Sequence, residues 1–288
     1  MSSPHATLAV IFDFDDTLVP DSTTALLEKH GLDPKKFWAT DAKALVQAGY
    51  DPSHAYLKLI LDNIGTGKPF GGLRNKDLKE FGRTLGRHFF PGVATLFKDL
   101  LGIVSKFRDI NIEFYVVSGG LQEIIEGCEL IQKNFSGIYG CELAGDTEDG
   151  ELKNIKRCIT FTEKTRFLFE INKGVKPKDT QKSPYLVNKD VPKDQRRVSF
   201  SNMIYVGDGL TDVPCFSLLK HFGGTPFGVF KGDSESAKRA LLEFLNPGRV
   251  ISMHRPRYRK SDDFGIMLRA AVATLCSKIQ VERGQAES

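Results

Sequence analysis

The stretch that most constrains this chain is an apolar run that ends in acids. Residues 8–12, LAVIF, are too few for a helix and too uniformly apolar for a strand with one face in water, so they predict a buried strand of a parallel sheet. Asp13, Asp15, Asp16 and Thr17 follow directly at its carboxyl end. Ligands bind at this edge of open α/β sheets, and buried carboxylates need a positive charge beside them. We therefore expect a divalent metal ion there.

Length and composition limit the class of protein. The 288 residues suit one large α/β domain, or a core with a smaller unit, and 41% hydrophobic with 26% charged residues is ordinary for a globular protein. The net charge of +4 suits an anionic substrate but gives no reason to expect nucleic acid or membrane partners. The five cysteines form no CxxC and no even set, which favours a reducing compartment. The N-terminus lacks the features of a signal peptide or membrane span, so we expect a cytoplasmic protein.

The segment from Pro20 to Phe89 carries helical patterns and no strand pattern. Asp33 with Pro34, and Asp51 with Pro52, are typical of a helix N-cap followed by the first helical residue. The segment is therefore predicted to be an all-helical unit beside the sheet, with helices over residues 23–30, 34–49, 51–61 and 75–88.

A second polar strand end lies further along the chain. The short apolar run 112–117 predicts a strand, which ends in Ser118, Gly119 and Gly120, and a helix is expected from Leu121. Glycines and the free amides of a helix start favour a bound anion. Taken alone, the pattern is more often a plain turn between strand and helix.

The region from Phe135 to Phe161 predicts a hairpin, and a helix ending at Gly174 follows it. Lys164 falls in the first turn of that helix, where the helix dipole disfavours a cation. Its position suggests that a nearby anion holds it, although a solvated lysine is the commoner case.

The last part of the chain adds two more acids after a strand. Residues 203–206 predict a strand that ends in the sequence GDGLTD, which contains Asp208 and Asp212. Further elements are expected at residues 227–230, 234–245, 250–253 and 262–278, with a disordered tail over 280–288. The basic loop 176–197 and the basic stretch 254–260 match no motif, and either a phosphorylated partner or simple solvation would explain their charge.

With these polar groups after its strands, the sequence resembles the haloacid dehalogenase superfamily of phosphoryl-transfer enzymes. The first motif of that family, DxDxT, matches residues 13–17, and the second matches Ser118. The third, a lysine that opens a helix, matches Lys164, and the fourth, GDGxxD, matches residues 207–212. The resemblance covers residues 6–20 and 90–230. It implies an α/β fold: a three-layer Rossmann-like core with a mainly parallel sheet (residues 1–20 and 90–288) and a small all-helical C1 cap (residues 21–89).

The chemistry expected of these residues is the hydrolysis of a phosphate monoester. A carboxylate can attack phosphorus to form an aspartyl phosphate, and Asp13, nearest the strand, is the predicted nucleophile. Asp15 is the predicted general acid and base. Mg²⁺ is expected on Asp13, Asp208 and the backbone carbonyl of Asp15, with Asp212 in support. The predicted phosphate-binding residues are Thr17, Ser118, Gly119 and Lys164.

The resemblance also narrows the reaction and the substrate. Dehalogenases of the superfamily lack the second acid, so Asp15 favours a phosphatase, and small-molecule phosphatases such as phosphoserine phosphatase are the nearest relatives implied. Those enzymes usually carry a glutamate soon after the first motif, where this chain has only Asp21 nearby. The expected partner is a small phosphorylated substrate. A phosphotransferase with a non-water acceptor, or a non-catalytic binding protein, remains an alternative. Trp38, His54 and Tyr56 are expected to be mostly core.

Overall fold

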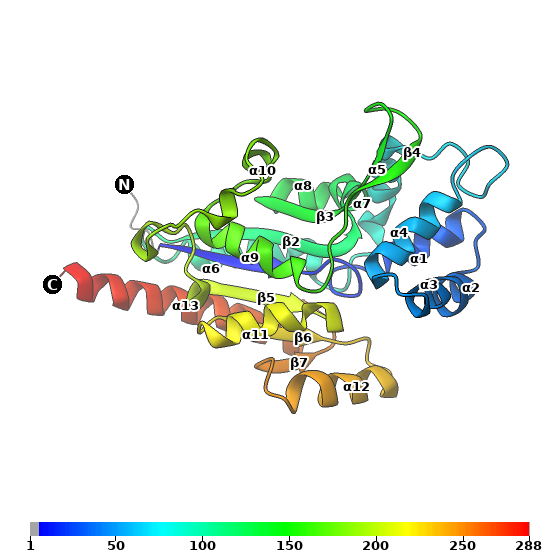
Figure 1. Ribbon diagram of the computed structural model, residues 1–288. Helices are drawn as coiled ribbons and strands as arrows, with labels where there is room; N and C mark the ends of the chain where they lie inside the picture. Colours follow the sequence, from blue (N-terminus) through cyan, green and yellow to red (C-terminus); the bar gives the residue numbers. More distant parts are fainter. Residues whose placement is uncertain (1–5, 288) are drawn as a thin grey trace.

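The structure, a computed structural model that describes residues 6–287, is built on one seven-stranded sheet (Figure 1). The strand order is β4-β3-β2-β1-β5-β6-β7, and every neighbouring pair is parallel except β3 with β4. The predicted α/β class is thus confirmed. The strands are β1 (Thr7–Phe12), β2 (Asn111–Leu121), β3 (Gly137–Gly145), β4 (Leu152–Arg157), β5 (Met203–Gly207), β6 (Thr225–Val229) and β7 (Ser252–His254).

Helices cover both faces of the sheet, which gives the three layers that the sequence predicts. In Figure 1, α9 and α11 lie together in front of the sheet, and α6 and α13 lie together behind it. The helices are α1 (Ser22–Lys29), α2 (Pro34–Lys36), α3 (Lys43–Gln47), α4 (Pro52–Asp62), α5 (Asn75–Thr84), α6 (Val93–Val104), α7 (Gln122–Gly127), α8 (Glu129–Asn134), α9 (Glu163–Lys173), α10 (Pro177–Lys182), α11 (Val213–His221), α12 (Ser234–Ala240) and α13 (Asp263–Glu287).

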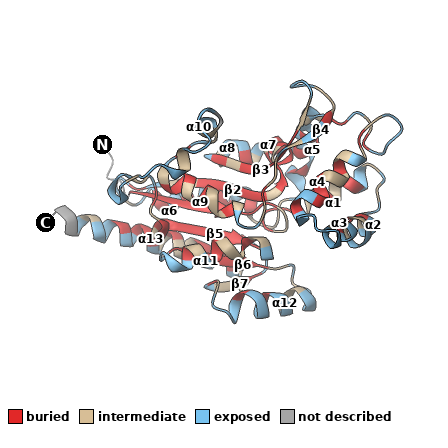
Figure 2. Ribbon diagram, in the orientation of Figure 1, coloured by how far each residue is buried: buried red, intermediate tan, exposed pale blue. Residues whose placement is uncertain are grey.

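The first strand occupies the middle of the sheet. β1 lies between β2 and β5 and is buried along its whole length. Figure 2 shows that its neighbours β2 and β5 are also largely buried. A strand with neighbours on both edges and helices on both faces has no side exposed to water, which explains its uniformly apolar sequence.

Helices α1–α5, which follow β1 and precede α6, form an insert at the carboxyl end of the strands (Figure 1). Two glycines allow this insert to touch the core closely. A Cβ on Gly82 of α5 would lie 2.0 Å from the carbonyl oxygen of Ile124, and one on Gly127 would lie 2.1 Å from that of Lys79. α5 therefore packs backbone to backbone on α7. The division into core and cap at residues 21 and 89 stays a prediction.

Several predicted boundaries are wrong for local reasons. β2 continues through Ser118–Gly120 to Leu121, with a register irregularity before Leu121, and the helix expected from Leu121 begins one residue later, as α7 at Gln122. The loop after α9 contains α10, which has Pro177 in its first turn. The tail expected to be disordered is helical as far as Glu287, and Ser288 lies outside the described residues.

Helix α13 carries an unusually apolar sequence. Over Asp263–Gly284 it is the one helix of the described chain that is long and apolar enough to cross a membrane, with a mean hydropathy of 1.3. Part of this apolar surface belongs to the core, because one side of the helix is buried against the body of the protein. Its buried residues are Phe264, Leu268, Val272, Leu275, Cys276 and Ile279.

Candidate active site

Three strand ends meet at one edge of the sheet. Phe12, the last residue of β1, is in register with Val116 of β2 and with Val206 of β5. Asp13 follows Phe12, and its backbone amide still donates to the carbonyl of Val206 at 2.8 Å. The register therefore places Asp13 between the Ser-Gly-Gly segment of β2 and the loop that carries Asp208.

A buried lysine joins two of the acids. Lys164, in the first turn of α9 and 1% exposed, donates to Asp13 at 2.9 Å and to Asp212 at 2.7 Å. Burial lowers the pKa of Lys164, but the two carboxylates outweigh it, and the net shift is upward. The expectation that a nearby anion holds this lysine is confirmed.

Asp212 is fixed from several sides. Besides Lys164, it accepts hydrogen bonds from the Tyr205 hydroxyl at 2.7 Å and the Gly209 amide at 3.0 Å. A Cβ on Gly207 would lie 2.4 Å from an Asp212 oxygen, so the glycine that ends β5 leaves the space for this carboxylate. The side chain is fully buried and well ordered by its partners.

Asp13, Asp208 and Asp212 together could hold a metal ion. Each offers a carboxylate oxygen, and the three oxygens lie within 4.8 Å of one another. Burial, and then the charge of Asp13, raise the pKa of Asp208 well above its ordinary range, so clustering these acids costs free energy that a cation would relieve. Oxygen donors of this kind suit Mg²⁺, so the residues fit the ion that the sequence predicts.

Asp15 lies beside this cluster, and its carboxyl accepts a hydrogen bond from the Ser22 amide at 2.7 Å. A Cβ on Gly120 would lie 2.4 Å from its other oxygen, so the glycine of β2 allows the approach. Burial, and then the charge of Asp21, raise the pKa of Asp15 to about 8. The group is therefore a proton donor at neutral pH.

The second strand brings a polar turn to the same place. The Ser118 hydroxyl accepts from the Gly120 amide at 3.1 Å, and the Gly119 carbonyl accepts from the Tyr56 hydroxyl at 2.5 Å. Ser118 is 1% exposed. Tyr56 belongs to α4, so this contact ties the helical insert to the strand edge.

A cavity of about 180 Å³ opens over these groups. Its lining includes five of the eight residues that the sequence predicts for the site, namely Asp13, Asp15, Ser118, Gly119 and Asp208. Lys164 and Asp212 are buried beside Asp13 and do not line it. Thr17 is fully buried too, and its hydroxyl has no hydrogen-bond partner among the described residues.

Four cavity residues come from the insert or its start and were missed by sequence reasoning. These are Asp21, Thr23, Trp38 and Tyr56. Tyr56 is a core residue as expected and Trp38 packs against the core, but both also line the cavity. Helical periodicity marks such rings as buried without telling what they are buried against. His54 is exposed, so the expectation that it is mostly core is wrong.

Asp16, for which no role is predicted, also lines the cavity. Its backbone is left-handed, with φ 54°, and its carboxylate pairs with Lys231 at 2.7 Å. A larger cavity of about 640 Å³, lined by Asp16, Asp208 and residues of α12, adjoins this side of the site.

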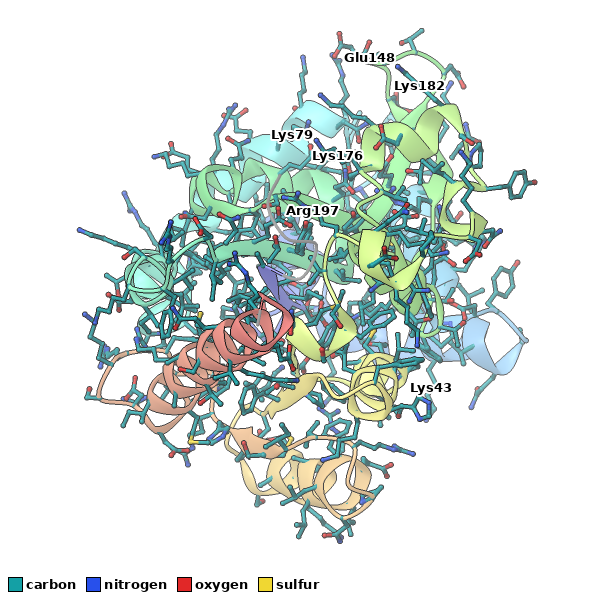
Figure 3. The ribbon with its side chains drawn as sticks, turned by 90° about the vertical axis from the view of Figure 1, so that its left-hand side faces the viewer. Lys43, Lys79, Glu148, Lys176, Lys182 and Arg197 are labelled. Carbon is teal, nitrogen blue, oxygen red and sulfur yellow. The ribbon has the colours of Figure 1, made fainter. Side chains whose placement is uncertain are left out.

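The unexplained basic loop lies away from this edge. Figure 3 looks from the side opposite the insert, and the labelled Lys176, Lys182 and Arg197 lie on the upper part of that face. The cavity of about 720 Å³ under this loop is lined by residues of α9 and by Tyr185 and its neighbours, and no predicted site residue lines it. The loop is thus outside the candidate active site.

Comparisons with known proteins give one sequence relative and one solved structure that supports the fold. No protein-family model matches the chain. A Borreliella burgdorferi protein, described only as uncharacterized, is 31% identical over 271 residues, which cover 84% of this chain and 90% of that protein. A probable phosphoserine phosphatase from Vibrio cholerae is similar in structure, with a TM-score of 0.54 and 12% identity over 97% of this chain and 68% of that one. A HAD family hydrolase from Salmonella enterica serovar Typhi has a TM-score of 0.49 and 15% identity over 82% of this chain and 66% of that one.

Proposed function

This chain is in one family with the Borreliella burgdorferi protein and has a haloacid dehalogenase-like fold, and from that premise we propose that it is a Mg²⁺-dependent phosphomonoesterase of the haloacid dehalogenase superfamily. The observation that supports this most is the arrangement of Asp13. Its carboxylate faces a cavity, lies against Lys164 and shares an oxygen cluster with Asp208 and Asp212. A nucleophile and charge neutralisation are thus found together.

In the proposed reaction Asp13 attacks the phosphorus atom, forms an acyl phosphate and releases an alcohol. Two hydrogen bonds hold the Asp13 carboxylate in place. One of its oxygens accepts from the Phe14 amide at 2.7 Å, and the other accepts from Lys164. The Ser118 hydroxyl and the Gly119 backbone line the space where the phosphoryl oxygens would lie.

Asp15 moves the protons. It gives a proton to the leaving oxygen in the first step and takes one from water in the second, which returns Asp13 to its carboxylate form. The Ser22 amide holds one Asp15 oxygen, so the other is directed to the cavity. This acid supports a phosphatase over a dehalogenase, because a departing halide needs no proton.

Mg²⁺ fits the oxygens of Asp13, Asp208 and Asp212, and the backbone carbonyl of Asp15 is a further proposed donor. When bound, the ion supplies positive charge that offsets the phosphoryl oxygens and the clustered acids. The charge of Lys164 offsets the repulsion among these acids, and its hydrogen bonds hold Asp13 and Asp212 in position.

The surroundings fit a small substrate in a reducing compartment. The cavity over Asp13 is small, about 180 Å³, and Trp38 and Tyr56 of the helical insert line it, which supports a role of the insert as a cap. All five cysteines are free thiols, which supports the cytoplasmic location. We propose hinges near residues 19–22 and 89–92, where the chain enters and leaves the insert.

Hydrolysis of para-nitrophenyl phosphate tests the proposal, measured with and without Mg²⁺ for the wild type and for Asp13→Asn. We expect metal-dependent turnover that falls at least about a thousandfold in the variant. Asp33→Asn is the matched control, since Asp33 is an exposed helix cap far along the insert. Wild-type inactivity toward this ester and a panel of metabolite phosphates would contradict the proposal.

A further inference from the structure

Two aromatic rings of the helical insert form a wall of the cavity over Asp13. The rings of Trp38 and Tyr56 have centroids 5.8 Å apart and planes inclined at 49°. Both side chains line the cavity. The ester side of a substrate whose phosphorus lies against Asp13 would therefore meet aromatic surface.

The polar ends of both rings are already used by the protein. The Trp38 indole nitrogen donates to the Thr24 hydroxyl at 2.9 Å, and the Tyr56 hydroxyl donates to the Gly119 carbonyl at 2.5 Å. Neither donor is left for an anionic or neutral acceptor on the substrate. What the rings offer the cavity is their faces, and the face of an aromatic ring attracts cations.

The charges around the cavity point the same way. No lysine, arginine or histidine is among the described residues that line it. The nearest buried cation, Lys164, is held by Asp13 and Asp212. Asp21 lines the cavity, caps α1 by accepting from the Thr24 amide at 3.0 Å, and has no ion pair among the described residues.

We propose that the substrate is the phosphate monoester of a small alcohol bearing a cationic amine, with Trp38, Tyr56 and Asp21 holding the amine. This inference rests on the proposed function and deepens it. In this cavity a substrate carboxylate would meet Asp21 and the two aromatic rings, and the lysines beside it, Lys164 and Lys231, already pair with acids, so anionic esters are disfavoured. The volume of about 180 Å³ over Asp13 suits a small alcohol.

The first arm of the test compares esters that match in shape. Phosphoethanolamine is paired with n-propyl phosphate, phosphocholine with 3,3-dimethylbutyl phosphate, and phosphoglycolate supplies an anionic group. We expect kcat/KM to be at least about tenfold higher for a cationic ester than for its neutral isostere, and lowest for phosphoglycolate. The two pairs also tell a primary amine from a quaternary ammonium group.

The second arm uses Asp21→Asn. Asparagine caps a helix as well as aspartate, so the variant removes the charge and keeps the fold. The ratio of kcat/KM for the cationic ester over its neutral isostere should fall about tenfold, mainly through KM. Asp33→Asn, which changes the cap of α2 away from the cavity, should leave that ratio as it is.

A third arm needs no turnover, because Trp38 is the chain's single tryptophan. Choline or ethanolamine should change its emission in a saturable way in the wild type, and much more weakly in Asp21→Asn. Hydrolysis with equal or reversed preference among the esters would overturn this inference and leave the phosphatase proposal standing. Saturable binding of choline or ethanolamine without hydrolysis of any ester would support the amine site and overturn the phosphatase proposal. If neither binding nor hydrolysis is seen, the amine site and the phosphatase proposal are both overturned.

Discussion

The strand edge and the helical insert build the two sides of one cavity in different ways. At the edge, Asp13 and Asp208 each directly follow a strand and Ser118 lies near the end of one, and the parallel register alone brings them together. In the insert, Trp38 and Tyr56 come from separate helical turns and reach the cavity through packing. We therefore expect the residues of the strand edge to carry out the reaction, and the residues of the insert to select the substrate.

The largest expected difference in stability is between variants of the two lysines that pair with acids of the site. Lys164→Met leaves Asp13 and Asp212 buried without their cation, which should cost about 3–5 kcal/mol of unfolding free energy and abolish turnover. Lys231→Met, at a partly exposed pair with Asp16, should cost less than about 1 kcal/mol. Urea unfolding measures both. Equal losses in the two variants would contradict the buried ion-pair role of Lys164.

The next largest effect is expected on the turnover number, from a substitution of Gly120 in β2. In Gly120→Ala the new methyl group would displace the Asp15 carboxyl, which it would approach to 2.4 Å, so kcat should fall about a hundredfold. Gly102→Ala in α6 has nothing within 4 Å of its new methyl group and serves as the control for an added Cβ. Unchanged hydrolysis by Gly120→Ala would remove Asp15 from the proton transfer.

On the insert side, Tyr56→Phe removes the hydrogen bond between α4 and the Gly119 carbonyl. One such bond contributes about 1 kcal/mol, so kcat/KM should fall about fivefold. Tyr50→Phe, outside the cavity, is the control. A loss as large as that of Gly120→Ala would mean that the insert takes part in the chemistry itself.

At the contact between the insert and α7 of the core, we expect a smaller change in the free energy of unfolding, which depends on pH. Glu123 of α7 is buried, and burial is the main cause that raises its pKa from 4.5 to about 7. Between these values the native state holds the proton more tightly than the unfolded chain, so the free energy of unfolding falls as pH rises. Glu123→Gln should therefore gain about 2 kcal/mol over the wild type at pH 8 and little at pH 4.5.

Chemical denaturation at both pH values measures this gain. Glu129→Gln, at an exposed pair with Lys133, is the control and should stay within about 0.5 kcal/mol of the wild type at both. A gain of the same size at pH 4.5 would rule out the titration of Glu123 as its cause.

The difference between the strand edge and the insert also explains which site residues can be predicted from the sequence. Asp13, Ser118 and Asp208 are foreseeable because a short apolar strand fixes where its next residues lie. Lys164 is foreseeable only together with these motifs, since a lysine in a first helical turn is more often solvated. Trp38 and Tyr56 are not, because helical periodicity gives burial and no partner. The helix expected from Leu121 exists and begins at Gln122, while β2 ends beyond the predicted run 112–117 because glycines carry no signal of where a strand stops.

The most direct test of the central claim is to look for the phosphoryl group on Asp13. Asp15→Asn lacks the base for the second step, and para-nitrophenol leaves without needing a proton, so the acyl phosphate should accumulate. After mixing with the ester and Mg²⁺ and quenching in acid, peptide mass spectrometry should find one added phosphoryl group on Asp13. An unmodified Asp13 in a protein whose wild type hydrolyses the ester would contradict the account.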